Sequence, residues 1–209
     1  SAEFTDMYER TRNNAGGKFA RLWQGKCFEE LDQITQALGV YEDLLTLTPD
    51  TPVKATLYDL SLRFKLICLN HEQKKDYPLV VTLAEEWLGM FRDRARTEAG
   101  YGIEWELCRA LEKLGTDSSK SETERSQALN QALTHARALS RTSGEFKAPS
   151  QALVQRLMRS LNRNADEPTD FESAYGMATQ LAEDIEQLRQ QIVVAQQDGQ
   201  LAEAKSKQN

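Results

Sequence analysis

Histidine, cysteine and proline are scarce in this sequence of 209 residues, which has two His, three Cys and five Pro. The cysteines, Cys27, Cys68 and Cys108, lie far apart, without a Cys-x-x-Cys motif or a neighbouring histidine. Such spacing predicts neither a metal site nor a disulfide framework. His71 and His135 each lack a nearby partner that would orient the ring for proton transfer. We therefore expect no metal, no cofactor and no catalytic residue. The alternative is an enzyme whose site forms only in three dimensions.

The sequence also lacks an excess of positive charge and a long hydrophobic run. The net charge is -6 and the isoelectric point is about 5.1, whereas a nucleic-acid binder needs a basic face. The longest nearly uncharged apolar stretch, YPLVVTLA, is far shorter than the roughly 20 residues that cross a bilayer. We expect neither nucleic-acid binding nor membrane insertion.

The first ten residues, SAEFTDMYER, contain no initiator Met and no apolar signal-peptide core. We interpret the sequence as a segment of a longer protein, or a processed product, from which any targeting sequence has been removed. The cell compartment stays open.

Helix-forming residues dominate what is present. Hydrophobic residues make up 40% and charged residues 28%, with 11 Gly among the 209 positions. This mixture favours an all-α fold. Helix starts are predicted at Thr51 and Asp76 as N-caps and at the capping box of residues 121–124, and Gly115 is expected to close a helix as C-cap.

The apolar periodicity predicts eight helices in one domain over residues 18–197, after a lead over 1–17 and before a polar tail over 198–209. Short loops favour antiparallel neighbours. The fold class expected is therefore an all-α stack of about four antiparallel helical hairpins that ends in a long C-terminal helix. Their ranges are about 18–49, 52–92, 97–142 and 148–197.

Three of the second helices share a +3, +4, +3 spacing of mostly apolar residues, and an Asp lies one or two residues before each set. The sets are Ile34, Ala37, Tyr41 and Leu44; Tyr77, Val80, Ala84 and Trp87; and Phe171, Ala174, Ala178 and Leu181. The second helix of the third hairpin fits less well. The spacing alone indicates amphipathic helices, whereas its recurrence with small residues indicates a repeat.

The first hairpin resembles a tetratricopeptide repeat. Gly25 is followed by Phe28, Ala37, Tyr41 and Pro49 at +3, +12, +16 and +24, the spacing of the small residue, aromatic, alanine, aromatic and proline in that family. The two small residues would let two helices approach, the aromatics would fill the space beside them, and the proline would end the second helix.

Two features depart from the family. Arg21 and Gln24 stand where the family usually has Trp and Leu, with Trp23 beside them. The first two sets of apolar residues are 43 residues apart, whereas the family unit has about 34 and HEAT-type units have about 40 to 47. A HEAT-like stack is therefore the alternative architecture.

The resemblance implies a non-enzymatic scaffold that binds a peptide or helix of a partner protein in a concave groove lined by the first helices. It places two sets of residues in that groove: Phe19, Leu22, Lys26, Glu29 and Glu30 in the first hairpin, and Trp105, Arg109, Glu112 and Lys113 in the third. The other interpretation is that these are solvated helix faces. Leu22 and Lys26 do not fit the Lys and Asn of members that capture a C-terminal carboxylate.

The C-terminal helix carries a hypothesis of its own. Leu181, Ile185, Leu188 and Ile192 continue a heptad alternation that favours parallel two-stranded coils, so a homodimer through this helix is expected under this hypothesis. The alternative is a capping helix that packs its apolar side on the fourth hairpin. The two interpretations are compatible.

Overall fold

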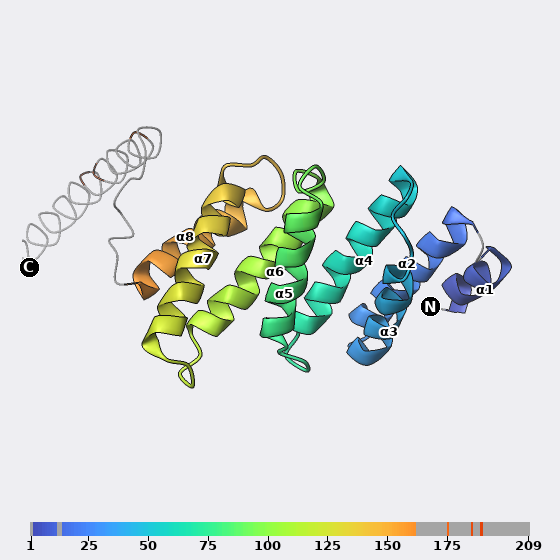
Figure 1. Cartoon of the computed structure of the whole chain (residues 1–209), viewed down its shortest axis with the longest axis horizontal. Coiled ribbons are helices and arrows are strands. Elements are labelled where there is room, and N and C mark those ends of the chain that lie inside the picture. Colours follow the sequence, from blue (N-terminus) through green and yellow to red (C-terminus); the bar gives the residue numbers. More distant parts are fainter. Residues whose placement is uncertain (1, 12–13, 162–174, 176–184, 186–188, 190–209) are drawn as a thin grey trace, which may run out of the picture. The chain divides into compact units, whose positions relative to one another are not determined.

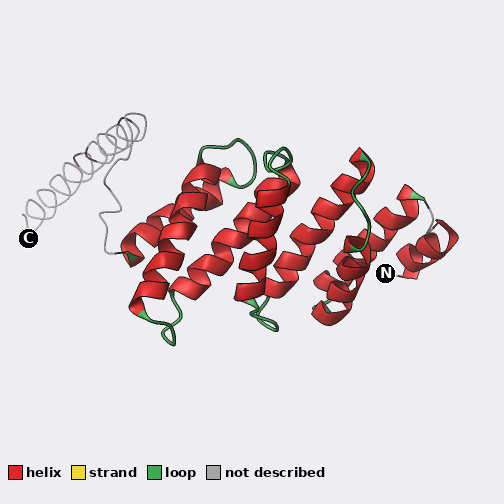
Figure 2. Cartoon of the chain, in the orientation of Figure 1, coloured by secondary structure: helices red, strands yellow, loops and turns green. Residues whose placement is uncertain are grey.

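The computed structural model describes residues 2–11 and 14–161, together with residues 175, 185 and 189. The chain divides into two units, residues 1–163 and residues 164–209, and the first is described below. The described part of the chain consists of helices joined by loops and turns, without a strand (Figure 2). The predicted all-α class is therefore confirmed.

Eight helices follow one another in the first unit, and each packs against the next in the chain (Figure 1). They are α1 (Ala2–Thr11), α2 (Ala15–Glu30), α3 (Ile34–Leu45), α4 (Pro52–Asn70), α5 (Tyr77–Met90), α6 (Glu98–Gly115), α7 (Glu122–Ser140) and α8 (Lys147–Ser160). Helix α2 also packs against α4, and α4 against α6. Helix α1 lies within the predicted lead of residues 1–17, where the sequence analysis did not predict a helix.

Side-chain contacts give the direction of these helices. Asn70, at the end of α4, donates from Nδ2 to Glu106 Oε2 of α6 at 2.8 Å, and Arg63, earlier in α4, contacts Gly102, earlier in α6. Helices α4 and α6 therefore run in the same direction. Helix α7 runs against α6, because His135 near the end of α7 lies 2.8 Å from Glu104 in the first half of α6.

The predicted N-caps are present. Thr51 Oγ1 accepts from the Lys54 amide at 3.3 Å, and the Asp76 carboxylate accepts from the Leu79 amide at 3.4 Å. Ser121 and Glu124 form the complete capping box at the start of α7. These residues fix helix starts because each satisfies an amide that has no partner within the helix.

Gly115 is not the C-cap that the sequence predicted. It is the last residue of α6, and Thr116 is the C-cap. A Cβ atom at Gly115 would lie 2.5 Å from Cγ of Leu129 in α7. Its small size thus serves the contact between α6 and α7 rather than a left-handed turn.

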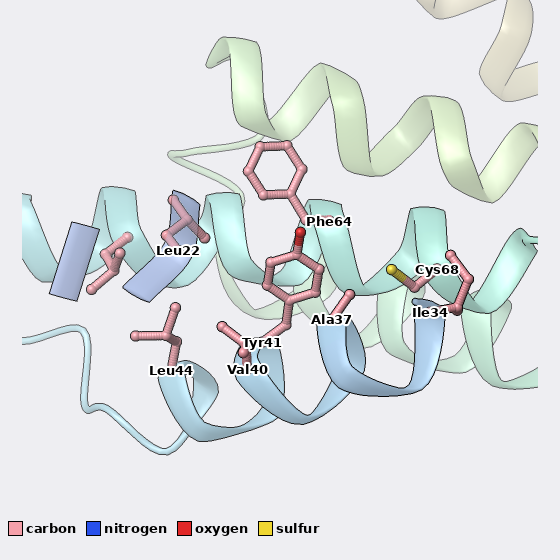
Figure 3. Close-up of a cluster of buried hydrophobic side chains, with 9 residues drawn as sticks. Leu22, Ile34, Ala37, Val40, Tyr41, Leu44, Phe64 and Cys68 are labelled. Atoms are coloured by element: carbon pink, nitrogen blue, oxygen red, sulfur yellow. The ribbon is translucent and has the colours of Figure 1, made fainter. Parts of the chain in front are cut away.

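The second helix of each of the first two hairpins buries the apolar face that its spacing predicted. Ile34, Ala37, Tyr41 and Leu44 of α3 are buried in one cluster with residues of α2 and α4 (Figure 3). In α5, Val80, Ala84 and Trp87 are buried. The +3, +4, +3 pattern therefore marks the side of α3 and of α5 that packs on the rest of the unit.

Tyr41 joins three helices in this cluster. Its ring centroid lies 5.8 Å from that of Phe64 in α4, and its hydroxyl donates to Glu29 Oε2 in α2 at 3.1 Å. Burial and the neighbouring Glu29 carboxylate raise the pKa of Tyr41 well above its ordinary value. A Cβ atom at Gly25 would lie 2.5 Å from Cε1 of the same ring. Tyr41 thus fills the space that a glycine leaves open on α2.

Replacing Gly25 with Ala is expected to destabilise the protein by about 1–3 kcal/mol, because the added methyl group must displace the Tyr41 ring from a packed core. Gly39 provides the matched control. It lies inside α3 with no atom within 4 Å of an added Cβ, so Gly39→Ala should be neutral or stabilising by up to about 1 kcal/mol. Urea unfolding of the three proteins measures both changes. Equal stabilities of the two variants would contradict the close approach at Gly25.

A buried carboxylate holds the loop that joins α5 to α6. Asp59 of α4 has a side chain only 5% exposed, and it accepts from Trp87 Nε1 at 2.9 Å. Arg94 of the loop lies 3.2 Å from the same oxygen and places its guanidinium over the ring of Phe91, 3.8 Å from the centroid. Burial raises the pKa of Asp59 above its ordinary value, although Trp87 and Arg94 favour the charged form.

The raised pKa of Asp59 predicts a pH-dependent contribution to stability. The folded protein holds this proton more tightly than the unfolded chain does, so the contribution of Asp59 falls as pH rises from about 4 through its raised pKa. Asp59→Asn cannot titrate but keeps an oxygen for Trp87. We expect the free energy of unfolding of the parent, minus that of the variant, to decrease with pH over this interval in urea titrations. An increase would show that Arg94 outweighs burial.

Candidate interaction surface of the first helices

Helix α6 packs against α4, α5 and α7, and one of its faces lies between the sides that contact α4 and α7. Gly102 and Glu106 face α4, and Cys108 faces α7, where its thiol lies 3.9 Å from the Ala132 carbonyl oxygen. Trp105 and Arg109, one turn apart, lie between these two sides of the helix. Trp105 is partly exposed and Arg109 is exposed. Both side chains thus reach solvent on this face of α6, and their role in binding stays a prediction.

The groove residues predicted in α2 are placed differently. Leu22 is fully buried, so its assignment to the groove is wrong. Lys26 Nζ contacts Glu29 Oε1 at 2.5 Å and lies 5.0 Å from the ring centroid of Phe64 in α4. Because Glu29 also accepts from Tyr41, Lys26 and Glu29 connect α2 to α3 and α4. Both side chains are mostly buried and act as helix contacts more than as an open lining.

The residue of α2 that the sequence analysis missed is Trp23. Its side chain is 48% exposed. It stands one turn after Phe19, which packs partly against the core, and two residues before Gly25, which faces α3. Two residues turn a helix by about 200°, so the face opposite Gly25 carries Trp23. The spacing from Phe19 was the signal in the sequence that could have identified it.

Helix α4 supplies the middle of the same surface. Leu60 and Ile67 are partly buried apolar residues at the edge of the first core cluster. The sequence analysis assigned no groove residue to α4. We call the side of α2, α4 and α6 that carries Trp23, Leu60, Ile67, Trp105 and Arg109 the first-helix surface.

The loop of residues 141–146 borders this surface at α6. Glu145 lies 2.9 Å from the guanidinium of Arg63, whose Cζ lies 5.1 Å from the ring centroid of Phe146. The rings of Phe146 and Trp105 are 6.4 Å apart. Arg63 of α4 thus reaches past α6 and ties the loop to α4. Gly144 gives the loop a positive φ of 110°, which residues with a side chain rarely adopt.

Arg109 is held in place while much of it stays in solvent. Its Nη1 lies 2.9 Å from Glu106 Oε2, and the Glu106 side chain is only 4% exposed. Asn70 donates a second hydrogen bond to that carboxylate. The Arg109 side chain is 45% exposed, so donors of its guanidinium face solvent. This arrangement suits an incoming carboxylate or carbonyl oxygen.

Cys68 and Cys108 are buried in the fold, and His135 contacts a neighbouring helix. Burial raises the pKa of Cys68 to about 12, and burial also raises the pKa of Cys108 well above its ordinary value. Both thiols therefore stay protonated at neutral pH. His135 pairs with Glu104 between α7 and α6. The described residues include no group of three or more His, Cys, Asp or Glu that could hold a metal ion.

Two further predictions concern membrane insertion and self-association. No helix in the described part of the chain is long and apolar enough to cross a membrane. Of the predicted self-association residues, Leu181, Leu188 and Ile192 lie outside the described residues. Ile185 is described, and its side chain is half exposed. Self-association stays a prediction.

Comparison with known proteins gave no match: no protein-family model, no curated protein and no solved structure is similar to this chain at a significant level. The arrangement of eight helices is compatible with a helical repeat. The tetratricopeptide resemblance therefore rests on the five positions from Gly25 to Pro49.

Gly102→Ala is expected to loosen the loop of residues 141–146. The added Cβ would occupy the place of the Arg63 guanidinium, and this flexible side chain would swing away from Glu145 and Phe146. Hydrogen exchange should become faster at the amides of residues 141–146 while α2 and α3 keep the rates of the parent. Unchanged exchange in the loop would show that Arg63 does not hold it.

Proposed function

We propose that this chain is a non-enzymatic scaffold that binds a peptide or helix of a partner protein on its first-helix surface. The observation that carries the proposal is the alignment of α2, α4 and α6. Helix α4 packs against both α2 and α6, and the face of each helix that turns away from α3, α5 and α7 bears aromatic, aliphatic and arginine side chains that are exposed or only partly buried.

The architecture we infer is a right-handed stack of tetratricopeptide-like hairpins. The packing of α2 with α3, of α4 with α5 and of α6 with α7 supports hairpins, and the packing of α2 with α4 and of α4 with α6 supports their stacking. The first helices begin at residues 15, 52 and 98, so the units differ in length. This irregularity keeps the HEAT-like alternative open, and both architectures present the same surface.

The chemistry of the surface favours protein binding. Aromatic and arginine side chains contribute most to protein interfaces, because an aromatic ring buries a large area with few rotatable bonds and a guanidinium donates several hydrogen bonds. Trp23 and Trp105 offer aromatic area, and Arg109 offers donors for a carboxylate or carbonyl. Leu60 and Ile67 lie between them on α4. A bound chain would thus cross α2, α4 and α6 in turn.

The test is capture of a partner from native cell extract by the parent and by the triple variant Trp23→Ala, Trp105→Ala, Arg109→Glu. The control variant, Leu79→Ala with Met90→Ala, removes exposed apolar side chains from α5, which is a second helix. We expect the parent and the control to retain a partner that the triple variant loses by at least about tenfold in amount. Circular dichroism must first show equal helicity.

Two results would contradict the proposal. If the control loses the partner and the triple variant keeps it, binding occurs on the second helices. Because Trp105 contacts Phe146, its loss can unfold the triple variant. In that case Arg109→Glu and Trp23→Ala are each compared with the parent. Full retention of the partner by both single variants argues against this surface.

A further inference from the structure

A hollow of about 510 Å³ lies where α6 ends, α7 begins and α8 ends. It is formed by ends of helices that follow one another in the chain, far from Trp23 in sequence. The lining residues are Gly115, Thr116, Glu122, Arg125, Ser126, Leu129, Ser160 and Leu161. Both polar and apolar side chains line the hollow, so it suits a side chain that has a polar end and an aliphatic stem.

Arg125 is the cation of this hollow. Its Nε atom is buried and has no hydrogen-bond partner, and its guanidinium forms no ion pair within residues 2–11 and 14–161. A buried guanidinium nitrogen without an acceptor is costly, because it has lost water without a replacement. Arg125 also lines the hollow, so a carboxylate there would neutralise the charge of its guanidinium.

Most acidic side chains near the hollow are already engaged. Glu112 lies 3.0 Å from Nε of Arg156, and Glu124 accepts from the Ser121 amide at 2.9 Å. Asp117 accepts from the Ser119 amide at 2.9 Å. Glu122 is the acidic residue in the lining itself. The carboxylates of this region therefore leave Arg125 unneutralised.

Positive charge is concentrated in this part of the chain. Residues 113–161 contain eight Lys and Arg against four Asp and Glu, whereas residues 1–112 contain 14 against 19. Lys120 and Arg159 are close in sequence to the lining residues Glu122 and Ser160, and they form no ion pair in the described part of the chain. The sign of the net charge thus reverses along the described helices.

We propose that this positive end, defined by the hollow together with Lys120, Arg125 and Arg159, binds an acidic segment of a partner protein. One Glu or Asp side chain enters the hollow, pairs with Arg125 and accepts from the Ser126 hydroxyl. Neighbouring acidic side chains of the segment meet Lys120 and Arg159. This site is separate from the first-helix surface and does not depend on the proposed function.

A peptide fits the site better than a nucleic acid does. A phosphate backbone gains its affinity from many cations in a continuous track. Here a single cation, Arg125, lines the hollow, and the acidic residue Glu122 lines it as well. The chain carries a net charge of -6, so an acidic peptide is not drawn to it by long-range attraction. Binding of such a peptide would therefore report a local site.

The test is a titration of the isotope-labelled full chain with a ten-residue peptide of alternating Glu and Ala, capped at both ends, at about 50 mM salt, where exposed charges are weakly screened. Amide shifts are expected at Gly115, Thr116, Ser126 and Leu161. Arg125→Gln should weaken binding by about tenfold or more, since a charge-assisted bond is lost. Arg92→Gln, an equal change in net charge at an exposed loop residue, should leave binding unchanged.

Several outcomes would overturn the proposal. They are the absence of peptide-dependent shifts, shifts confined to other helices, and equal effects of Arg125→Gln and Arg92→Gln. Binding of single-stranded DNA of ten nucleotides at least as tightly as the peptide would assign the site to phosphate instead. Because Trp23, Trp105 and Arg109 are untouched, failure here leaves the first-helix surface unaffected, and loss of partner capture there leaves the peptide titration unaffected.

Discussion

The closest approach between helices, at glycines that lack a Cβ, is the constraint on which the arrangement of the first unit depends. At Gly25 the ring of Tyr41 occupies the place of a side chain, and at Gly115 the side chain of Leu129 does so. At Gly102 the occupant is the side chain of Arg63. These contacts join α2 to α3, α6 to α7 and α4 to α6. Gly25 and Gly115 therefore fix the separation of two helices and the rotation of each about its axis, whereas Gly102 makes room for one flexible side chain between α4 and α6.

The rotation of the helices decides which residues are left for a partner. Because Gly25 faces α3, Trp23 must face away from it, and Lys26 turns toward Phe64 of α4. Because Gly102 faces Arg63, Trp105 lies about 60° further round the helix, at the edge of the exposed face. The exposed aromatic residues are thus a consequence of where the small residues stand.

Buried polar side chains make one rotation and register of the packed helices specific, which small residues alone do not. Asp59, Asn70 and Glu106 each bond across two elements of the unit. Paired polar groups inside a core disfavour alternative rotations and registers, because any shift would leave a charge or an amide without a partner. Their direct contribution to the free energy of unfolding is modest, since burial of Asp59 costs part of what its hydrogen bonds return.

Local signals made much of the fold predictable from the sequence. Thr51, Asp76 and the capping box at Ser121 satisfy amides within three residues of themselves, so the sequence alone indicates where those helices begin. Asp32 had the same appearance but does not cap α3. It has a positive φ of 59° and accepts from Gln73 Nε2 at 2.7 Å, a contact with a residue 41 positions away. A partner so distant in sequence leaves no local signal.

Helix α1 explains why the first hairpin departs from the tetratricopeptide pattern. Gln24 is buried and donates to Thr5 of α1 at 2.5 Å, and Arg21 lies over the ring of Tyr8, 5.3 Å from its centroid. The polar residues at these two positions, where the family has Trp and Leu, therefore contact a hydroxyl and an aromatic ring of α1. The sequence of α1 does carry a helical signal that was overlooked, because Met7 and Tyr8 follow Phe4 at +3 and +4. The side of α2 that α1 covers is closed to a ligand, so the proposed partner would meet α2 at exposed residues such as Trp23 and Glu30.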